Sequence, residues 1–394
     1  MKPSENMRGI APSATLSVAA RARELRALGR DVLDLSAGEP DLPTPEFVRR
    51  AGMAAIERGL TRYTHVAGLP ELRQAIAREL WRRTGADVDP AGVVVSAGAK
   101  QALFNACFVL FGPGDRVLVP SPYWTSYPDI VRLARAEPVF VPGDPARGFK
   151  VGPAELGAAF DGRVRGLILN SPSNPTGAVY GLDELEAVVG WAAEHGVVVL
   201  SDEIYGQLCF TGRRAPSVLD LEPEPRARIV LIDGASKAFA MTGWRIGFSA
   251  SSPALGVEIQ ALQSHITSNA ATPAQYAALA AFSASAEERQ AFEAMARTFH
   301  ARRDLLLRLF AAELPGLELV RPDGAFYVFF RVPGGAGSVA FCERMLEEAG
   351  VALVPGAAFG EDGYARLSFA AAEAVLVEGV RRLGEALRAA AAAY

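Results

Sequence analysis

Between residues 93 and 250, short continuous apolar runs alternate with helix-like segments. Strands that are apolar on both faces are typical of a mainly parallel sheet that helices cover on both sides. This alternation predicts an α/β fold. The clearest helices between the runs are expected at 100–110 and 182–195. The runs themselves predict strands at 93–96, 117–120, 138–141, 166–170, 197–201, 228–232 and 246–250.

The two ends of the chain differ in character from this central part. One helix is expected at about 16–28, followed by the irregular Gly- and Pro-rich stretch LSAGEPDLPTP. After about residue 291 come a long basic helix, the hairpin-like LELVRPDGAFYVFFRV, and short helices and strands. We therefore expect a large domain with a mainly parallel sheet covered by helices, and a smaller α+β domain built from both termini. The expected limits are 1–45 and 291–394 for the small domain and 46–290 for the large one.

Polar side chains follow several of these apolar runs. Asn174 comes after one run, Asp202 and Tyr205 end the next, and Lys237 follows a third, with Arg245 eight positions further on. In open α/β sheets, ligands bind outside the carboxyl ends of the strands, so these side chains are expected to converge. A lysine near a second fixed cation suits imine chemistry with an anionic cofactor.

Composition narrows the class of function. The 394 residues, 50% apolar and 21% charged, suit a globular protein with more than one core. A net charge of −4 without blocks of like charge argues against nucleic acid or an anionic membrane as partner. The four histidines show no metal-binding spacing, and no apolar run approaches the length of a membrane span. The odd, scattered cysteines are typical of buried thiols in a reducing cytoplasm; they are Cys107, Cys209 and Cys342.

Nine ordered segments resemble one known family. In this order and spacing they are similar to class I aminotransferases dependent on pyridoxal 5′-phosphate, which have fold type I. Within that class the chain is most similar to bacterial aspartate aminotransferases of the thermophile type, from about Ile10 to Leu387. The resemblance implies that cofactor and a homodimer with shared active sites. The segments are GEPDLPTP, RYTHVAGLPELRQAIA, SAGAKQALFN, PSPYWTSYPDIV, NSPSNPTGAVY, VLSDEIYGQL, SKAFAMTGWRIGF, PDGAFYVFF and ARLSFA.

The resemblance assigns roles around the cofactor ring. Lys237 would hold the cofactor aldehyde as a Schiff base and then move the proton between the substrate α-carbon and the cofactor. Asp202 would pair with the protonated pyridine nitrogen, so that the ring draws electrons from the substrate. Asn174 and Tyr205 would donate hydrogen bonds to the phenolic oxygen, and Trp124 would stack on the ring.

The cofactor phosphate is expected where the first apolar run turns through Gly98 and Ala99 into the helix that begins near Lys100. Backbone N–H groups at a helix N-terminus bind anions, and small residues allow a close approach. Arg245 would add a fixed charge with a fork of donors.

Two further phosphate contacts depend on the resemblance alone. The family places a serine three residues before the lysine, and this chain has Gly234 there, with Ser236 as a possible replacement. Tyr63 would reach the cofactor phosphate bound by the neighbouring subunit. This contact is the reason to expect a dimer.

The resemblance also implies a substrate site. Arg366 would clamp the α-carboxylate, a planar task that lysine does less well, with the backbone of Gly38 and the side chains of Trp124 and Asn174 beside it. Lys100, Ser13 and Thr15 would meet a second, distal carboxylate. Relatives often carry a lysine just before the PSAT segment, where this chain has Ala11, and this weakens the expectation of a bulky substrate such as prephenate.

The function expected from these residues is a ping-pong transamination of an L-amino acid, preferably aspartate, with 2-oxoglutarate. An aromatic or broad-range aminotransferase, with prephenate among its possible substrates, is the first alternative, because a pocket without a dedicated distal arginine tolerates apolar side chains. Two more alternatives keep the cofactor: a carbon–sulfur lyase, and a regulator without catalysis. The regulator would need a basic DNA-reading segment, and none precedes Gly38.

Overall fold

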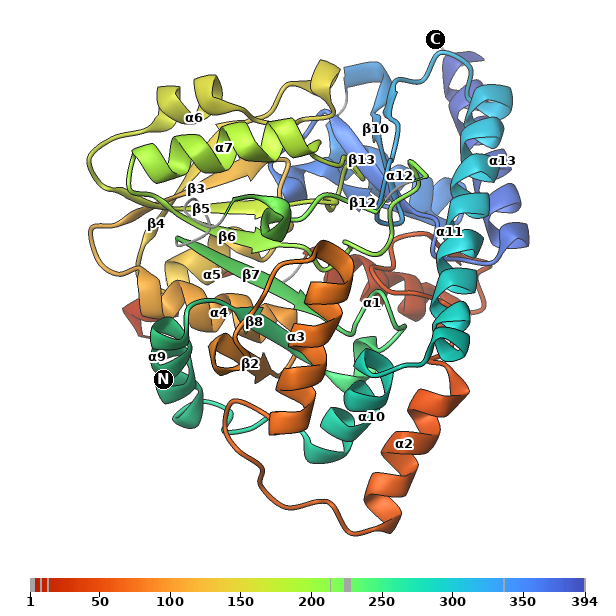
Figure 1. Ribbon diagram of the computed structural model, residues 1–394. Coiled ribbons are helices and arrows are strands. Elements are labelled where there is room, and N and C mark those ends of the chain that lie inside the picture. The colour runs from red at the N-terminus through yellow and green to blue at the C-terminus, as the bar shows by residue number, and fades with distance from the viewer. Residues whose placement is uncertain are drawn as a thin grey trace.

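The computed structural model describes residues 4–7, 9–12, 14–212, 214–222, 228–335 and 337–392. A seven-stranded sheet forms the centre of its larger part (Figure 1). The strand order is β2-β8-β7-β6-β5-β3-β4, and β8 runs antiparallel to both of its neighbours while the other pairs are parallel. The strands are β2 (Val93–Ser96), β3 (Arg116–Ser121), β4 (Glu137–Pro142), β5 (Val164–Asn170), β6 (Val198–Asp202), β7 (Ile229–Gly234) and β8 (Gly247–Ala250).

Helices cover both faces of this sheet. Successive strand residues enter opposite cores: Val93 and Val95 pack on one side, and Val94 packs on the other. Such burial on both faces explains why the strands are continuous apolar runs in the sequence. The helices are α2 (Glu46–Glu57), α3 (Pro70–Thr84), α4 (Ala99–Leu110), α5 (Tyr127–Leu133), α6 (Pro153–Ala159), α7 (Leu182–Glu194), α9 (Pro253–Ser264) and α10 (Thr272–Phe282).

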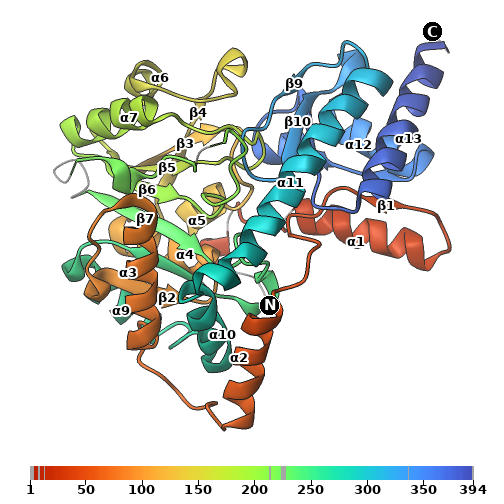
Figure 2. The ribbon, with the colours of Figure 1, turned by 45° about the vertical axis from the view of Figure 1, so that its right-hand side comes forward.

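A smaller part is built from both ends of the chain (Figure 2). Its antiparallel sheet has the order β12-β13-β10-β9, and β1 (Leu33–Asp34) pairs in parallel with β11 (Val351–Ala352). The predicted fold class, a large mainly parallel sheet with a smaller α+β part, is confirmed, whereas the three domain limits stay a prediction. The other elements are α1 (Ala14–Ala27), β9 (Leu319–Val320), β10 (Tyr327–Arg331), α12 (Ser338–Glu348), β12 (Val354–Pro355), β13 (Tyr364–Ser368) and α13 (Glu373–Ala392).

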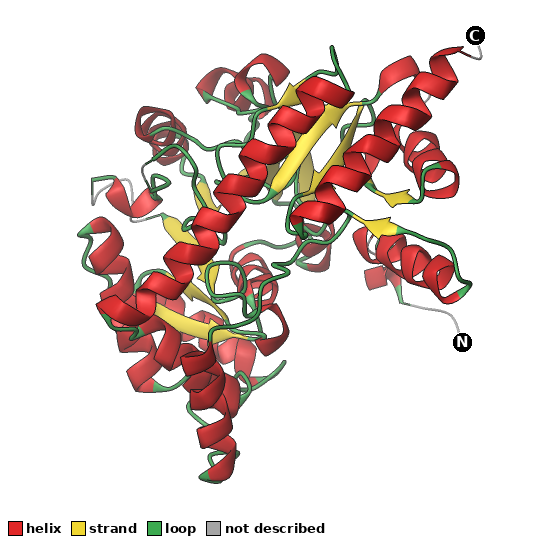
Figure 3. Cartoon of the chain, turned by 90° about the vertical axis from the view of Figure 1, so that its right-hand side faces the viewer, coloured by secondary structure: helices red, strands yellow, loops and turns green. Residues whose placement is uncertain are grey.

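The long helix α11 (Ala286–Glu313) connects the two parts (Figure 3). It begins earlier than the sequence indicated, because Ser285 and Glu288 form a reciprocal cap in which each side chain accepts the backbone N–H of the other. Further along, Arg302 makes two hydrogen bonds to the carboxylate of Asp41, at 2.6 and 3.0 Å. The helix is thereby tied to the segment that leads from the small part into the large one.

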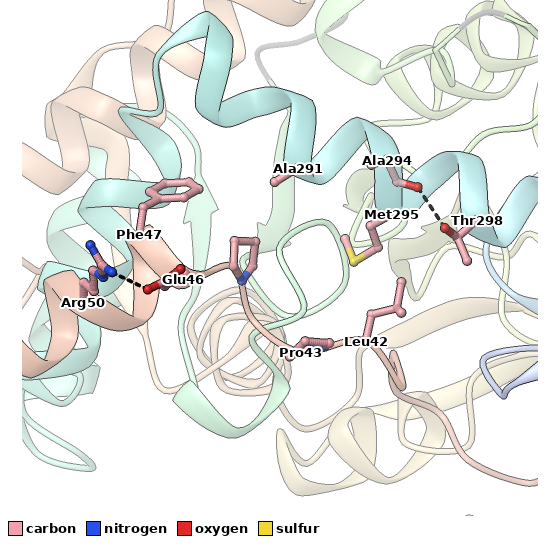
Figure 4. A pocket seen from close by; sticks show the side chains of 10 residues that line it. Leu42, Pro43, Glu46, Phe47, Arg50, Ala291, Ala294, Met295 and Thr298 are labelled. Atoms are coloured by element: carbon pink, nitrogen blue, oxygen red, sulfur yellow. Dashed lines mark hydrogen bonds and ion pairs between the residues drawn. The ribbon is translucent and has the colours of Figure 1, made fainter.

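A groove of about 590 Å³ lies where this segment meets α11 (Figure 4). Leu42 and Phe47 line one side, Met295 lines the other, and an ion pair between Glu46 and Arg50 lies at its rim. The candidate residues that the structure describes lie elsewhere. Among the described residues, no helix combines the length and apolar character needed to cross a membrane.

Candidate active site

A cavity of about 450 Å³ lies between the large sheet, α1 and the small sheet. This volume is in the range of small-molecule sites. Of the candidate residues, Gly98 lies just behind its lining, Tyr63 does not line it, and Ser13 is outside the described residues. The candidates that line it are Thr15, Gly38, Ala99, Lys100, Trp124, Asn174, Asp202, Tyr205, Ser236, Lys237, Arg245 and Arg366.

The topology of the large sheet explains this convergence. Asp202 is the last residue of β6 and is paired with Asn170, the last residue of β5. Lys237 follows the end of β7 at the same edge. Since β8 is antiparallel, Arg245, which precedes it, also lies at the carboxyl edge of the parallel strands. The crevice expected at that edge is therefore formed by residues from distant parts of the sequence.

Lys237 lines the cavity and is half-buried, with its amine donating to the carbonyl oxygen of Gly38. Burial, together with the charges of Arg366 and Arg245, lowers the pKa of this amine to about 8, against the opposing charge of Glu39. Desolvation disfavours the charged form of a lysine, so a substantial fraction of the amine is neutral near physiological pH. A neutral amine can act as a nucleophile or accept a proton.

Asp202 is a buried carboxylate with few partners. It accepts hydrogen bonds from the Tyr127 hydroxyl at 2.7 Å and from the Ile204 N–H at 3.2 Å. Burial raises the pKa of Asp202 to about 6, while the bond from Tyr127 opposes the rise. None of the described cations forms an ion pair with it. A buried carboxylate in this position suits a cationic group of a bound molecule.

The turn from β2 into α4 offers backbone donors to an anion. Gly98 has φ of 90°, in the left-handed region that favours glycine, and a Cβ there would lie 2.4 Å from Nη2 of Arg245. The guanidinium of Arg245 donates through Nη1 to the Thr242 carbonyl at 2.9 Å. The N-terminus of α4 and this guanidinium thus lie together, an arrangement that binds phosphate groups.

Positions 234 and 236 differ in whether they can offer a hydroxyl group to a bound anion. A Cβ at Gly234 would lie 2.8 Å from the Cα of Gly247 and 2.9 Å from the Ile246 carbonyl oxygen. The close pairing of β7 and β8 therefore leaves no space for a serine at position 234. Ser236 is buried but lines the cavity, so its hydroxyl is the one available from this loop.

Arg366 is a buried cation without an acidic partner among the described residues. It lies in β13, is 1% exposed, and donates to Asn174 Oδ1 at 2.8 Å and to the Ser36 carbonyl at 2.7 Å. Its guanidinium lies 4.2 Å from the centre of the Tyr327 ring, and its Nε has no hydrogen-bond partner in the described chain. A buried charge of this kind is stable only if paired, so the arrangement suits an anionic ligand.

Two tyrosines that the sequence analysis left without a role lie in the same cavity. Tyr127 is the donor to Asp202, and the Tyr327 hydroxyl is 2.9 Å from the Tyr205 hydroxyl. A Cβ at Gly38 would lie 3.3 Å from the hydroxyl of Tyr327, so the backbone at Gly38 packs closely against this side chain. Both tyrosines belong to quoted segments, PSPYWTSYPDIV and PDGAFYVFF, and that is the one signal that could have found them.

Lys100, Trp124 and Thr15 also line the cavity. The Lys100 amine lies 4.9 Å from the centre of the Trp124 ring. Burial, with a smaller effect of Arg245, lowers the pKa of Lys100. Tyr63, by contrast, is 89% exposed and is not among the residues that line this cavity.

Comparison with known proteins agrees with this geometry. The family model for aminotransferase class I and II matches residues 30–383. An aspartate aminotransferase of Geobacillus stearothermophilus is 41% identical over 389 residues, covering 97% of this chain and 98% of the relative. An aspartate/prephenate aminotransferase of Thermus thermophilus is 43% identical over 386 residues, covering 98% of each.

A solved structure is equally similar. The aspartate aminotransferase from Thermus thermophilus with maleate has a TM-score of 0.93 and 40% identity, and the match covers 98% of this chain and 100% of that one. The match spans both sheets and the cavity between them. From its sequence, its fold and this arrangement of residues, the chain belongs to the class I and II aminotransferases.

Proposed function

We propose that this chain uses pyridoxal 5′-phosphate to transfer the amino group of an L-amino acid, preferably aspartate, to 2-oxoglutarate in a ping-pong reaction. The observation that carries the proposal is that Arg366 and Lys237, two basic residues in unusual surroundings, line the same cavity. Arg366 is buried and has no acidic partner among the described residues, and the pKa of Lys237 is lowered to about 8. The buried charge of Arg366 needs an anion as its partner, and Lys237 provides a neutral amine.

The residues present fit the cofactor. Gly98, the N-terminus of α4 and Arg245 form a place for its phosphate, and Asp202 is the buried carboxylate for its pyridinium nitrogen. When bound, pyridoxal 5′-phosphate supplies an aldehyde for the amine and a ring that draws electrons from the substrate. Asn174 and Tyr205, both buried in the cavity wall, are the proposed donors to its phenolic oxygen, and the half-buried Trp124 is proposed to stack on the ring.

Two residues of the protein would then have separate roles, one in substrate binding and one in proton transfer. Arg366 holds the substrate α-carboxylate through its guanidinium, which Asn174 and the Ser36 carbonyl orient. Lys237, once its amine is free, takes a proton from the substrate α-carbon and returns one. The lowered pKa suits this task, because a general base works best when its pKa lies near the working pH.

Part of the cavity wall supports the preference for a dicarboxylic substrate. Lys100 and Thr15 line the cavity and are the proposed partners of the distal carboxylate, together with Ser13. The named relatives are aspartate or aspartate/prephenate aminotransferases, and the Thermus thermophilus structure contains maleate, which is a dicarboxylate. Both carboxylates of aspartate would thus meet a cation.

A homodimer with shared active sites is part of the proposal. Tyr63 is 89% exposed, and shortly before it in the chain Met53 and Ile56 on α2 are 58% and 60% exposed. Met53 and Ile56 are three positions apart and so lie on one face of α2, and apolar side chains exposed side by side in this way are typical of an interaction surface. Tyr63 is proposed to reach the phosphate bound by the partner subunit.

A spectral titration tests this function directly. The protein with bound cofactor should change its absorbance on addition of aspartate, and 2-oxoglutarate should restore the original spectrum. Alanine and phenylalanine should act more slowly, by about tenfold or more, because they lack the distal carboxylate. Faster conversion of phenylalanine than of aspartate would favour the aromatic alternative. Release of pyruvate and ammonia without an oxo-acid acceptor would favour a lyase.

The lowered pKa of Lys237 predicts how pH affects covalent attachment of the cofactor to the cofactor-free protein. The neutral amine is the reactive form, so the rate should rise with pH below about 8 and level off above it. An ordinary lysine, with a pKa near 10.5, would continue to gain rate up to that pH. Stopped-flow absorbance between pH 7 and 10 measures the profile, with a lysine-containing peptide as the reference. A rate that still rises through pH 10 would contradict the lowered pKa.

A further inference from the structure

Gln263 lies in the last turn of α9, and its side chain is 0% exposed. Its Nε2 donates to the carbonyl oxygens of Val66 at 2.8 Å and Val95 at 2.9 Å. Its Oε1 accepts from the Ser96 hydroxyl at 2.5 Å and from Asn105 Nδ2 at 3.0 Å. A side-chain amide has two N–H donors and an oxygen with two lone pairs, so each of them has a partner here. One buried side chain therefore joins strand β2 and helix α4 to the segment that contains Val66.

Strand β2 and helix α4 form the site proposed for the cofactor phosphate. Ser96 is the last residue of β2 and Asn105 lies in the second turn of α4, so they stand on either side of the turn at Gly98. Gln101, in the first turn of α4, donates to Asn105 Oδ1 at 2.7 Å. Backbone N–H groups bind an anion best when they are held in position before it arrives. The bonds of Gln263 hold both sides of this turn.

The third segment, which contains Val66, also carries Tyr63. Its backbone is anchored on both sides of this tyrosine. Oγ1 of Thr272 donates to the carbonyl oxygen of the residue before Tyr63 at 2.7 Å, and Nε2 of Gln275 donates to the hydroxyl of the residue after it at 3.0 Å. Tyr63 itself is 89% exposed. An exposed side chain on an ordered backbone loses little further entropy when it contacts another molecule.

This segment also packs closely against β2. The Val95 N–H donates to the Ala67 carbonyl at 2.9 Å, and Gln275 Oε1 accepts from the Leu69 N–H at 2.8 Å. Gly68 has φ of 98°, and a Cβ there would lie 2.7 Å from the Cβ of Val95. Buried polar groups lose free energy when their partners are removed, so these bonds fix the segment to the strand that leads into the phosphate site.

We propose that Gln263 is a positioning residue for the cofactor phosphate. It holds the Gly98 turn, which would bind the phosphate of its own subunit, in a fixed arrangement with the segment that presents Tyr63 to the phosphate bound by the partner subunit. The inference rests on the proposed function and deepens it. Gln263 is not among the residues that line the cavity, so it acts through the residues that it orients. Contacts to the cofactor ring, proposed for Asp202 and Trp124, do not depend on it.

The test compares two forms of the cofactor on the cofactor-free protein. Pyridoxal lacks the phosphate group but keeps the ring and the aldehyde. Gln263→Leu removes all four bonds and should lower the affinity for pyridoxal 5′-phosphate about tenfold, but that for pyridoxal less than about threefold, as expected when donors to a charged group are misplaced. Equilibrium titration followed by absorbance measures both affinities. Inorganic phosphate should also compete with pyridoxal 5′-phosphate about tenfold less well in the variant.

Two further variants keep the test independent of stability. Ser96→Ala removes one of the four bonds and should show the same selectivity for the phosphate form, at about threefold. Ser338→Ala breaks bonds of an equally buried side chain in the small part, which donates to Asp362 at 2.6 Å and accepts from the Ala357 N–H at 3.0 Å. Its affinities for both forms should match the wild type. Thermal unfolding of the cofactor-free proteins reports the stability of each variant.

A double-mutant cycle tests the link to the partner subunit. Tyr63→Phe removes the hydroxyl proposed to reach the partner's phosphate, so adding Gln263→Leu to it should reduce the affinity by a smaller factor than in the wild type. Fully additive losses would contradict the role of Gln263 toward that phosphate. If Gln263→Leu weakens the binding of both forms equally, or of neither, the inference is wrong and the proposed function stands. If the wild type binds neither form or converts no amino acid, the proposed function fails, and the inference fails with it.

Discussion

Replacement of Lys237 by alanine should slow the conversion of aspartate by on the order of 10⁴-fold, the upper range for loss of a positioned acid–base group. On the proposed function, the variant lacks the amine that would attach the cofactor and also the base that would move the proton at the substrate α-carbon. Among the described residues that line the cavity, Lys100 is the other lysine, and none is a histidine. A single turnover with aspartate, followed by stopped-flow absorbance, measures the effect.

Two further variants separate the base from the charge. Lys237→Arg keeps a cation in place, but a guanidinium does not give up its proton in proteins, so the loss should be as large as in the alanine variant. Lys150→Ala removes a lysine that pairs with Glu184 outside the cavity, and its turnover should match the wild type. Conversion by Lys237→Ala within tenfold of the wild-type rate would show that another group performs both tasks.

The central strands could be predicted from the sequence because their residues are buried on both faces of the sheet. The run at 93–96 coincides with β2, and the other six runs fall within one or two residues of strand ends. Burial on both faces of a parallel sheet demands an apolar side chain at every position, and this leaves a continuous signal in the sequence. The polar residues that end such runs, Asp202 above all, could be predicted for the same reason.

Other features depend on contacts between distant segments. Tyr127 begins helix α5, and nothing local shows that its hydroxyl reaches Asp202 on β6. The need for glycine at position 234 comes from the antiparallel pairing with Gly247, which the apolar runs do not reveal. Sequence patterns report burial along an element, but not which side chains meet across elements.

Replacement of Asp202 by asparagine should lower the rate of the half-reaction with aspartate by on the order of 10³-fold, the range seen when one preorganised electrostatic group is removed from an active site. Asparagine has the same shape, and its side-chain oxygen can still accept from the Tyr127 hydroxyl. The variant therefore lacks mainly the negative charge that would keep the cofactor ring protonated. Single-turnover absorbance measures the rate, and the affinity for the cofactor should fall far less than the rate.

Tyr127→Phe distinguishes the charge of Asp202 from its packing. The bond from Tyr127 holds down the pKa of Asp202, which burial raises to about 6, so its loss should raise that pKa further. On the proposed function, activity requires the ionised carboxylate of Asp202, and the fall in rate on acidification should therefore begin at a higher pH in Tyr127→Phe than in the wild type. In Asp202→Asn this acidic limb should disappear, because the titrating group is gone. Asp202→Asn could instead convert aspartate within a few-fold of the wild-type rate and still lose rate at low pH. That result would show that a different group activates the cofactor ring.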